Sequence, residues 1–299
     1  MHRGMSFLLR KERDLNMKSH EEEYDAGRQK ELRYSIAKEE TKEGFVFRWF
    51  RIEREEDDPI PGLLVHHPPR PTGKLLLFVH GLGGRKEDVT WFREVAEASG
   101  FSMLAIDARK HGERQSEVGS VSATDLLEGL SRTVADNRLA LDVALRNGWT
   151  TEGRVILAGI SMGGILGSII AGVDQRIGGA ALYVPGGDLP DILAKSKHPT
   201  VTQVRGNIPK FLFKALGSQF ANIEPLNYVD RISPRPLLVQ LGEHDDIVPF
   251  EDGMKLFRRA KEPKDLVVHD SGHDLPRDRA ISETMSWVKK RLPSLAEGD

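Results

Sequence analysis

The sequence predicts an α/β protein built on a mostly parallel sheet of eight strands, with helices on both faces. Three observations lead to this prediction. The chain has 299 residues, of which 39% are hydrophobic, so it is long enough for one large domain with a substantial core. Short apolar runs rich in leucine and β-branched residues recur between turn residues, as in strands that are buried on both faces. Segments of helical pattern separate most of these runs, and this alternation favours parallel strands joined by right-handed crossovers.

The first elements are an extension and a hairpin. Residues 1–43 are rich in charge and show no strong periodicity, so we interpret them as an N-terminal charged extension of a domain over 44–299. Two runs, 45–53 and 63–67, then read as strands, and the turn-forming stretch "DDPIPG" separates them. We expect these two strands to pair as an antiparallel hairpin.

The remaining elements alternate between strand and helix. The apolar runs predicted as buried strands are 74–79, 101–106, 154–159, 178–184, 235–241 and 265–269. The segments predicted as helices are 87–99, 122–147, 162–173, 250–260 and 277–292.

Residues 186–229 depart from the alternation, because they are longer than a simple crossover. Their aromatic and aliphatic side chains include Phe211, Leu212, Phe213, Leu216 and Phe220. We expect a small helical cap inserted over the strand ends, and the alternative is a long crossover helix with extra loop. The phenylalanines could line an acyl pocket or pack the cap onto the core.

Composition excludes several classes of function. The chain has no cysteine, so disulfides, thiolate catalysis and thiolate metal sites are excluded. The net charge of −2 gives no general attraction to nucleic acid or to an anionic membrane. No apolar run approaches the roughly 20 residues that span a bilayer. The N-terminal apolar core "FLL" is shorter than a secretory signal requires. We therefore expect a cytoplasmic protein with no membrane span and no nucleic-acid partner, as a monomer or homodimer.

The stretch "AGISMGG" places Ser161 between two glycines, directly after a predicted buried strand and before an apolar helix. Gly159, Ser161 and Gly163 match G-x-S-x-G, and the strand–turn–helix context is the one that a nucleophile elbow requires. The tight turn forces the serine into a strained backbone conformation, and the glycines let strand and helix approach closely. We therefore interpret Ser161 as a nucleophile rather than as a structural turn serine.

A serine hydroxyl needs a base, and the base needs an orienting carboxylate. His273 lies in the loop after the last predicted strand, at the sheet edge where active groups gather. Asp245 and Asp246 both lie in the loop after strand 235–241, and either could be the acid on position alone. The chain order Ser, Asp, His is the one that α/β-hydrolases use.

These residues make the chain resemble α/β-hydrolase-fold serine hydrolases of the esterase and dienelactone-hydrolase-like groups, over about residues 45–292. In those families the acid commonly appears as G-x-x-D-x-x-V-P, which falls here on Gly242, Asp245, Val248 and Pro249. The resemblance therefore implies an α/β-hydrolase fold with Asp245 as the acid, and Asp246 as its neighbour.

An oxyanion hole needs two preorganised N–H donors, each worth about 2.7–4 kcal/mol of transition-state stabilisation. The residue after the nucleophile supplies one donor, here the Met162 amide. The loop after strand 74–79 reads His80-Gly81-Leu82-Gly83-Gly84. Its resemblance to the family's H-G motif implies the Leu82 amide as the second donor. His80 and Gly81 then support the loop.

A further stretch, "DARKHGERQS", follows strand 101–106 and resembles a loop that occurs after the fourth strand in this superfamily. We interpret Asp107, Arg109, His111 and Gly112 as a network that organises this loop beside the site. A metal site at His111 and Asp107 is disfavoured, because no second cluster with ligand spacing accompanies them.

We therefore expect a serine hydrolase that cleaves small-molecule carboxylic esters of small to medium acyl chain through an acyl-enzyme, with no metal and no organic cofactor. The same triad serves peptidases, thioesterases, acyltransferases and carbon–carbon hydrolases, and the fold does not decide among them. A non-catalytic binding module is a further alternative.

Overall fold

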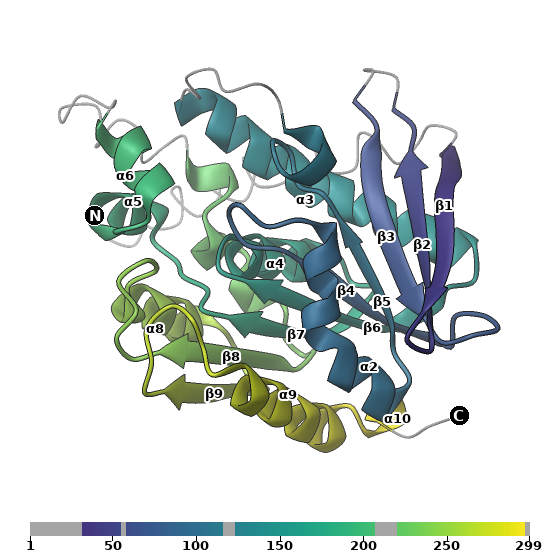
Figure 1. The fold of residues 1–299 in the computed structure, drawn as a ribbon. Coiled ribbons are helices and arrows are strands. Elements are labelled where there is room, and N and C mark those ends of the chain that lie inside the picture. The colour runs from purple at the N-terminus through teal and green to yellow at the C-terminus, as the bar shows by residue number, and fades with distance from the viewer. Residues whose placement is uncertain (1–31, 55–57, 116–122, 207–219, 297–299) are drawn as a thin grey trace, which may run out of the picture.

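A single nine-stranded sheet runs through the protein, in the order β1-β2-β3-β5-β4-β6-β7-β8-β9. The structure is a computed structural model that describes residues 32–54, 58–115, 123–206 and 220–296. Helices cover both faces of the sheet (Figure 1). The pairs β4·β5, β4·β6, β6·β7, β7·β8 and β8·β9 are parallel. The predicted α/β class, with a mostly parallel sheet covered on both faces, is therefore confirmed.

The sheet has one strand more than predicted. The strand β1 (Tyr34–Lys42) lies inside the predicted extension 1–43 and pairs antiparallel with β2 (Phe45–Ile52). After Tyr34 every β1 side chain is exposed, so this edge strand buries no apolar row. Because backbone pairing rather than hydrophobic alternation forms β1, the pattern that predicted the other strands could not detect it. The sheet therefore begins at Tyr34, ahead of the predicted boundary at residue 44.

The other strands match the predicted apolar runs. Their bounds are β3 Ile60–His66, β4 Gly73–Val79, β5 Ser102–Ile106, β6 Thr150–Ile160, β7 Ile177–Tyr183, β8 Leu237–Gly242 and β9 Lys264–His269. The predicted hairpin is formed by β2 and β3, which pair antiparallel. The strand β3 also pairs antiparallel with β5, and this joins the hairpin to the parallel part of the sheet.

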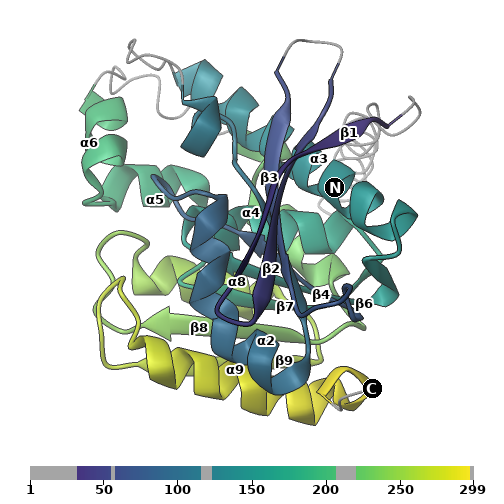
Figure 2. The ribbon, with the colours of Figure 1, turned by 45° about the vertical axis from the view of Figure 1, so that its right-hand side comes forward.

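Two helical layers bury the two faces of the sheet. The helices are η1 Lys86–Phe92, α2 Arg93–Ser99, α3 Ala123–Arg146, α4 Met162–Val173, α8 Phe250–Arg259, α9 Arg277–Arg291 and α10 Pro293–Ala296. Side chains of α3, α4 and α8 share one core with Leu75 and Leu77 of β4. Side chains of α2 and α9 share the other core with Leu76 and Phe78 (Figure 2). Successive residues of one strand thus point into two cores, which explains why its sequence is apolar without interruption.

The interval 186–229 contains short helices rather than one crossover helix. They are α5 Leu189–Lys195 and α6 Pro199–Gly206, followed by the turns η4 Phe220–Asn222, η5 Pro225–Asn227 and η6 Val229–Arg231. Both views place α5 and α6 at one side of the molecule, away from β1 (Figures 1 and 2). Phe220 packs against the core. Phe211, Leu212, Phe213 and Leu216 lie outside the described residues.

Within the described ranges, every helix is too short or too polar to cross a bilayer. The cytoplasmic location and the monomeric or dimeric state remain predictions.

Candidate active site

Ser161 occupies the turn between β6 and α4 in a conformation that non-glycine residues rarely adopt, with φ 56° and ψ −119°. Its amide donates a hydrogen bond to the Tyr183 carbonyl at 2.9 Å. The two flanking glycines are required by backbone contacts. A Cβ at Gly159 would lie 2.2 Å from the Gly163 carbonyl oxygen, and a Cβ at Gly163 would lie 1.9 Å from that of Val79. The turn therefore presses α4 against the end of β4 and holds Ser161 in its strained position.

Three polar side chains form one hydrogen-bonded series. The Ser161 Oγ lies 2.9 Å from His273 Nε2, and His273 Nδ1 lies 2.8 Å from Asp245 Oδ2. The other Asp245 oxygen accepts the amides of Ile247 and Val248, each at 2.9 Å. These two amides fix the orientation of the carboxylate, which then accepts a hydrogen bond from the Nδ1–H group of the imidazole. His273 Nε2 is thus left as an acceptor for the serine proton.

Backbone contacts bring the two loops of this series together. A Cβ at Gly242 would lie 2.0 Å from the Gly272 carbonyl oxygen, so only glycine allows the loops to approach this closely. The His244 amide also donates to the Ser271 carbonyl at 2.9 Å. The Asp246 side chain is 55% exposed and pairs with Lys197 at 3.2 Å. The structure therefore brings Asp245 to His273 and leaves Asp246 at the surface.

Two backbone amides near Ser161 lie outside the hydrogen bonds of their own turn and helix. The Gly84 amide donates to the Gly81 carbonyl at 3.0 Å, and this turn leaves the Leu82 amide outside its hydrogen bond. Gly81 lies beside Ser161, because a Cβ there would be 3.5 Å from the Ser161 Cβ. Met162 is the first residue of α4, so its amide is one of the helix N–H groups without an intrahelical partner. The residues predicted to form the oxyanion hole thus lie next to the serine along two separate segments.

His80 links the 80–84 loop to the loop after β5. Its Nε2 accepts the Ala108 amide at 3.0 Å, and its Nδ1 lies 2.8 Å from the Gly81 carbonyl oxygen. The ring must therefore be neutral, with the proton on Nδ1. Burial lowers the pKa of His80, which favours this neutral form.

Replacing His80 with alanine is expected to lower both stability and turnover. The Ala108 amide would lose its acceptor in a buried place, which costs about 1–3 kcal/mol. The Leu82 amide would lose its support, so we expect kcat to fall while KM changes less. Thermal unfolding and steady-state kinetics measure the two effects. His67→Ala is the control. His67 follows β3, which is antiparallel to β5, so it lies at the end of the sheet away from the carboxyl ends of the parallel strands and from Ser161. An unchanged kcat in His80→Ala would contradict the supporting role.

Asp107 organises the adjoining loop. Its carboxylate is fully buried and accepts the Lys86 amide at 2.8 Å and the Lys86 ammonium at 2.9 Å. The same ammonium donates to Glu113 at 2.8 Å. A Cβ at Gly112 would lie 2.2 Å from the Asp107 carboxylate, so this position needs glycine. The sequence predicted that Asp107 and Gly112 belong to this network. It did not predict Lys86, because a lysine within a charged stretch gives no sign that its side chain is buried.

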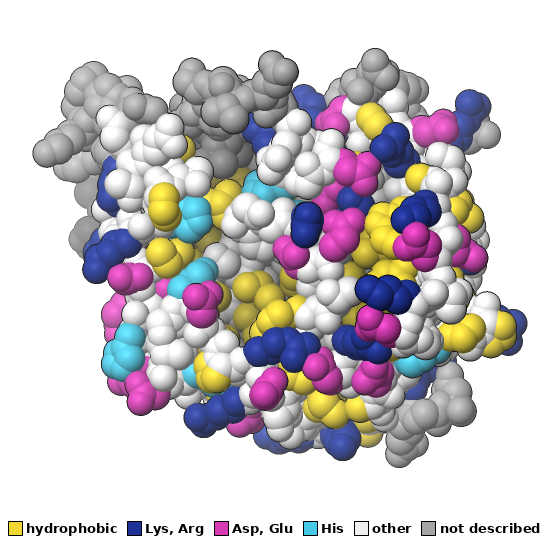
Figure 3. Space-filling view, viewed as in Figure 1, with side chains coloured by type: hydrophobic (Ala, Val, Ile, Leu, Met, Phe, Trp, Pro, Cys, Tyr) yellow, Lys and Arg dark blue, Asp and Glu magenta, His cyan; other side chains and the backbone are white. Residues whose placement is uncertain are grey.

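The surface around these loops is hollowed on the face shown in Figure 3. Hydrophobic side chains line the floor of the hollow, and histidines lie at its margins. Most of the charged side chains on this face lie outside the hollow.

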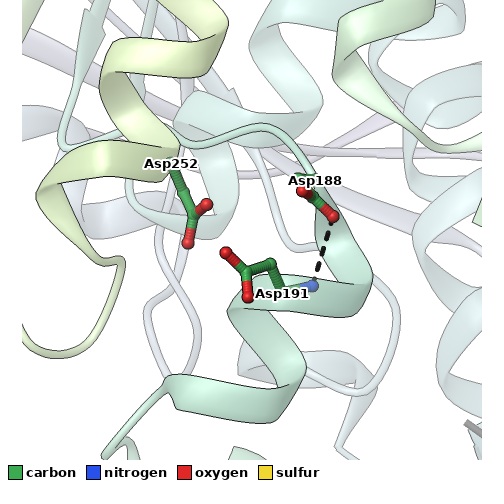
Figure 4. A group of neighbouring side chains, drawn as sticks. All are labelled: Asp188, Asp191 and Asp252. Carbon is green, nitrogen blue, oxygen red and sulfur yellow. Dashed lines mark hydrogen bonds between the residues drawn. The ribbon is translucent and has the colours of Figure 1, made fainter.

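A second group of polar residues lies between α5 and α8. Asp188, Asp191 and Asp252 each offer one carboxylate oxygen, and these oxygens lie within 4.8 Å of one another (Figure 4). Burial and the neighbouring Asp191 raise the pKa of Asp252 to about 6, whereas hydrogen bonds from Lys195 and Lys255 lower the pKa of Asp191 to about 2. Lys255 Nζ lies within 2.8 Å of an oxygen of each carboxylate, so an ammonium already occupies the position that a cation would take.

Comparison with protein families gives one match that spans most of the fold. The family model of the prolyl oligopeptidase family matches residues 91–292. This range runs from the end of η1 to the residue after α9, and it includes Ser161, Asp245 and His273.

Individual proteins similar to this chain include esterases. A putative esterase, YitV of Bacillus subtilis, is 26% identical over 237 residues, which cover 73% of this chain and 89% of the relative. The esterase YjfP of Escherichia coli is 20% identical over 60% of this chain and 72% of its own length. The solved structure of an acetyl xylan esterase from Paenibacillus sp. R4 superposes with a TM-score of 0.78 at 18% identity, over 92% of this chain and 94% of that one. This likeness shows that the two chains share the α/β-hydrolase fold.

Proposed function

Because this chain belongs to the prolyl oligopeptidase family, we propose that it is a serine hydrolase of the carboxylesterase type that forms an acyl-enzyme at Ser161. The observation that carries the proposal is the hydrogen-bonded series from Ser161 Oγ through His273 to Asp245, with links of 2.9 and 2.8 Å. The esterases among its relatives support the same activity.

The mechanism follows from the direction of these hydrogen bonds. His273 Nε2 takes the proton of the Ser161 hydroxyl as the oxygen attacks the ester carbonyl, and Asp245 stabilises the imidazolium that forms. The Leu82 and Met162 amides hold the oxyanion of the tetrahedral intermediate. His273 then returns the proton to the leaving alcohol. In the second half, His273 activates a water that attacks the acyl-enzyme and releases the acid.

The substrate that we propose is a small uncharged ester of small to medium acyl chain. The hydrophobic floor of the hollow in Figure 3 suits an apolar acyl group, because apolar surface on both partners leaves water together. No cofactor enters this reaction, since the serine, the base and the backbone donors supply each step.

Hydrolysis of p-nitrophenyl esters from acetyl to palmitoyl tests the proposal. We expect kcat/KM to be highest for a short or medium chain and to fall by at least about tenfold at palmitoyl, because each methylene beyond the pocket gains no burial. A maximum at palmitoyl would contradict the small-to-medium assignment and favour a lipase or a thioesterase.

Peptidase activity is the alternative that the family match favours, since the family is named after an oligopeptidase. Peptide p-nitroanilides distinguish the two activities under the same conditions. We expect these amides to be cleaved far more slowly than the best ester. Faster cleavage of an amide than of any ester would replace the esterase proposal with a peptidase.

A further inference from the structure

Lys255 is the centre of the carboxylate group between α5 and α8. Its ammonium lies 2.7 Å from Asp188 Oδ2, 2.8 Å from Asp191 Oδ2 and 2.8 Å from Asp252 Oδ1. The ammonium donates hydrogen bonds to Asp188 and Asp191, and its contact with Asp252 is an ion pair. Asp252 is fully buried, which makes its charge costly without this partner. Figure 4 shows Asp252 on α8, Asp191 on α5 and Asp188 at the residue before α5.

The contacts of this cluster join the start of the cap to the segment that carries Asp245. Asp252 lies in the first turn of α8, directly after that segment, and its carbonyl accepts the Gly187 amide at 3.0 Å. At the other end of α5, the Lys197 amide donates to the Asp246 carbonyl at 2.9 Å. The helix α5 is therefore attached at both ends to residues 245–252.

The backbone at the start of α5 needs support to keep its conformation. Asp188 has φ 70° and ψ 62°, a left-handed conformation that costs free energy in a residue other than glycine. The Glu224 carboxylate accepts the amides of Asp188 and Leu189 at 2.9 and 2.8 Å on one side. Lys255 holds the Asp188 side chain on the other side.

We propose that Lys255 is a positioning residue, whose ammonium acts as an internal cation that fixes the start of the cap against the segment carrying Asp245. This inference rests on the proposed function, because the property that it controls is the fit of the acyl group. Without the ammonium, the three carboxylates repel one another and α5 moves away from α8. The series Ser161–His273–Asp245 does not include Lys255, so the chemical step survives the change.

The variant Lys255→Met keeps the aliphatic stem and removes the charge. We expect KM for p-nitrophenyl hexanoate to rise by about tenfold, because a displaced cap misplaces the acyl chain, while kcat for the acetyl ester stays within about twofold. Lys255→Arg keeps the charge and should recover part of the loss. Lys261→Met is the matched control, since this lysine of the same region is 68% exposed and its nearest carboxylate lies 4.0 Å away. An unchanged KM, or an equal fall of kcat on both esters, would overturn the proposal.

Calcium provides a test that does not depend on activity. In Lys255→Met the three carboxylates lose the ammonium that they share, and among the described residues only Asp191 keeps a cationic partner, Lys195. Millimolar CaCl2 should therefore raise the midpoint of thermal unfolding of this variant and leave the wild type unchanged. Asp252→Asn in the same chain should abolish the calcium response. A wild type that CaCl2 stabilises as strongly as the variant would show that Lys255 does not fill the site. The wild type could hydrolyse no ester while the calcium responses are as expected. The esterase proposal would then fail, and the role of Lys255 in fixing α5 against α8 would stand.

Discussion

Replacing Ser161 with alanine is expected to lower kcat for ester hydrolysis by about 10⁴- to 10⁶-fold, with the fold intact. The hydroxyl oxygen is the atom that attacks the carbonyl in the series with His273 and Asp245, and alanine has no nucleophilic atom to replace it. Some catalysis over water should remain, because the backbone donors at Leu82 and Met162 still stabilise the oxyanion. Steady-state hydrolysis of the best p-nitrophenyl ester measures the loss, and thermal unfolding shows that the variant is folded.

Ser168→Ala is the matched control for this variant. Ser168 lies on the same helix, α4, is fully buried, and donates to the Ile165 carbonyl at 2.7 Å. Its loss should cost some stability and leave kcat unchanged. A fluorophosphonate probe should label the wild type and Ser168→Ala with the mass of one adduct, and should not label Ser161→Ala. Labelling of Ser161→Ala, or retention of its activity, would mean that another residue is the nucleophile.

The fold and the site could be predicted where burial restricts the residue types that fit a position, because that restriction is visible in the sequence. The strand β4 reads as an apolar run because its side chains fill two cores, and the same holds for β6 and β8. Around Ser161, the close backbone contacts of Gly159 and Gly163 leave glycine as the residue that fits, so the motif records a geometric requirement. The spacing from Gly242 to Asp245 could be interpreted for a similar reason, since Gly242 lies against Gly272.

One strand and two buried or clustered lysines could not be predicted, because no sequence pattern marks them. The strand β1 is solvent-exposed apart from Tyr34, so its sequence has the composition of a charged surface segment. Lys86 and Lys255 are lysines in charged stretches, and their roles depend on carboxylates that are distant in sequence: Asp107 for Lys86 and Asp188 for Lys255. Ion pairs of this kind can be identified only from the structure, because a single charged residue forms no periodic pattern in the sequence.

Asp245→Asn is expected to lower kcat by about 10⁴-fold while leaving the loop in place. The asparagine carbonyl oxygen can still accept the amides of Ile247 and Val248, which now bond to Asp245 Oδ1. The side-chain NH₂ then points at His273 Nδ1 and donates to it. The imidazole must therefore carry its proton on Nε2, and a protonated Nε2 cannot accept the proton of Ser161. The loss thus comes from the wrong tautomer of the base, and the unfolding midpoint should change little.

Asp246→Asn makes the same chemical change one residue away and separates the two candidate acids. The Asp246 side chain faces Lys197 at the surface, and an exposed ion pair of this kind contributes less than about 1 kcal/mol. Its carbonyl, which accepts the Lys197 amide, is unaffected by the substitution. Activity should therefore stay within about twofold of the wild type, since one weak surface pair is lost. A large loss in Asp246→Asn together with an active Asp245→Asn would exchange the two roles. Large losses in both would mean that the loop as a whole, rather than one carboxylate, orients His273.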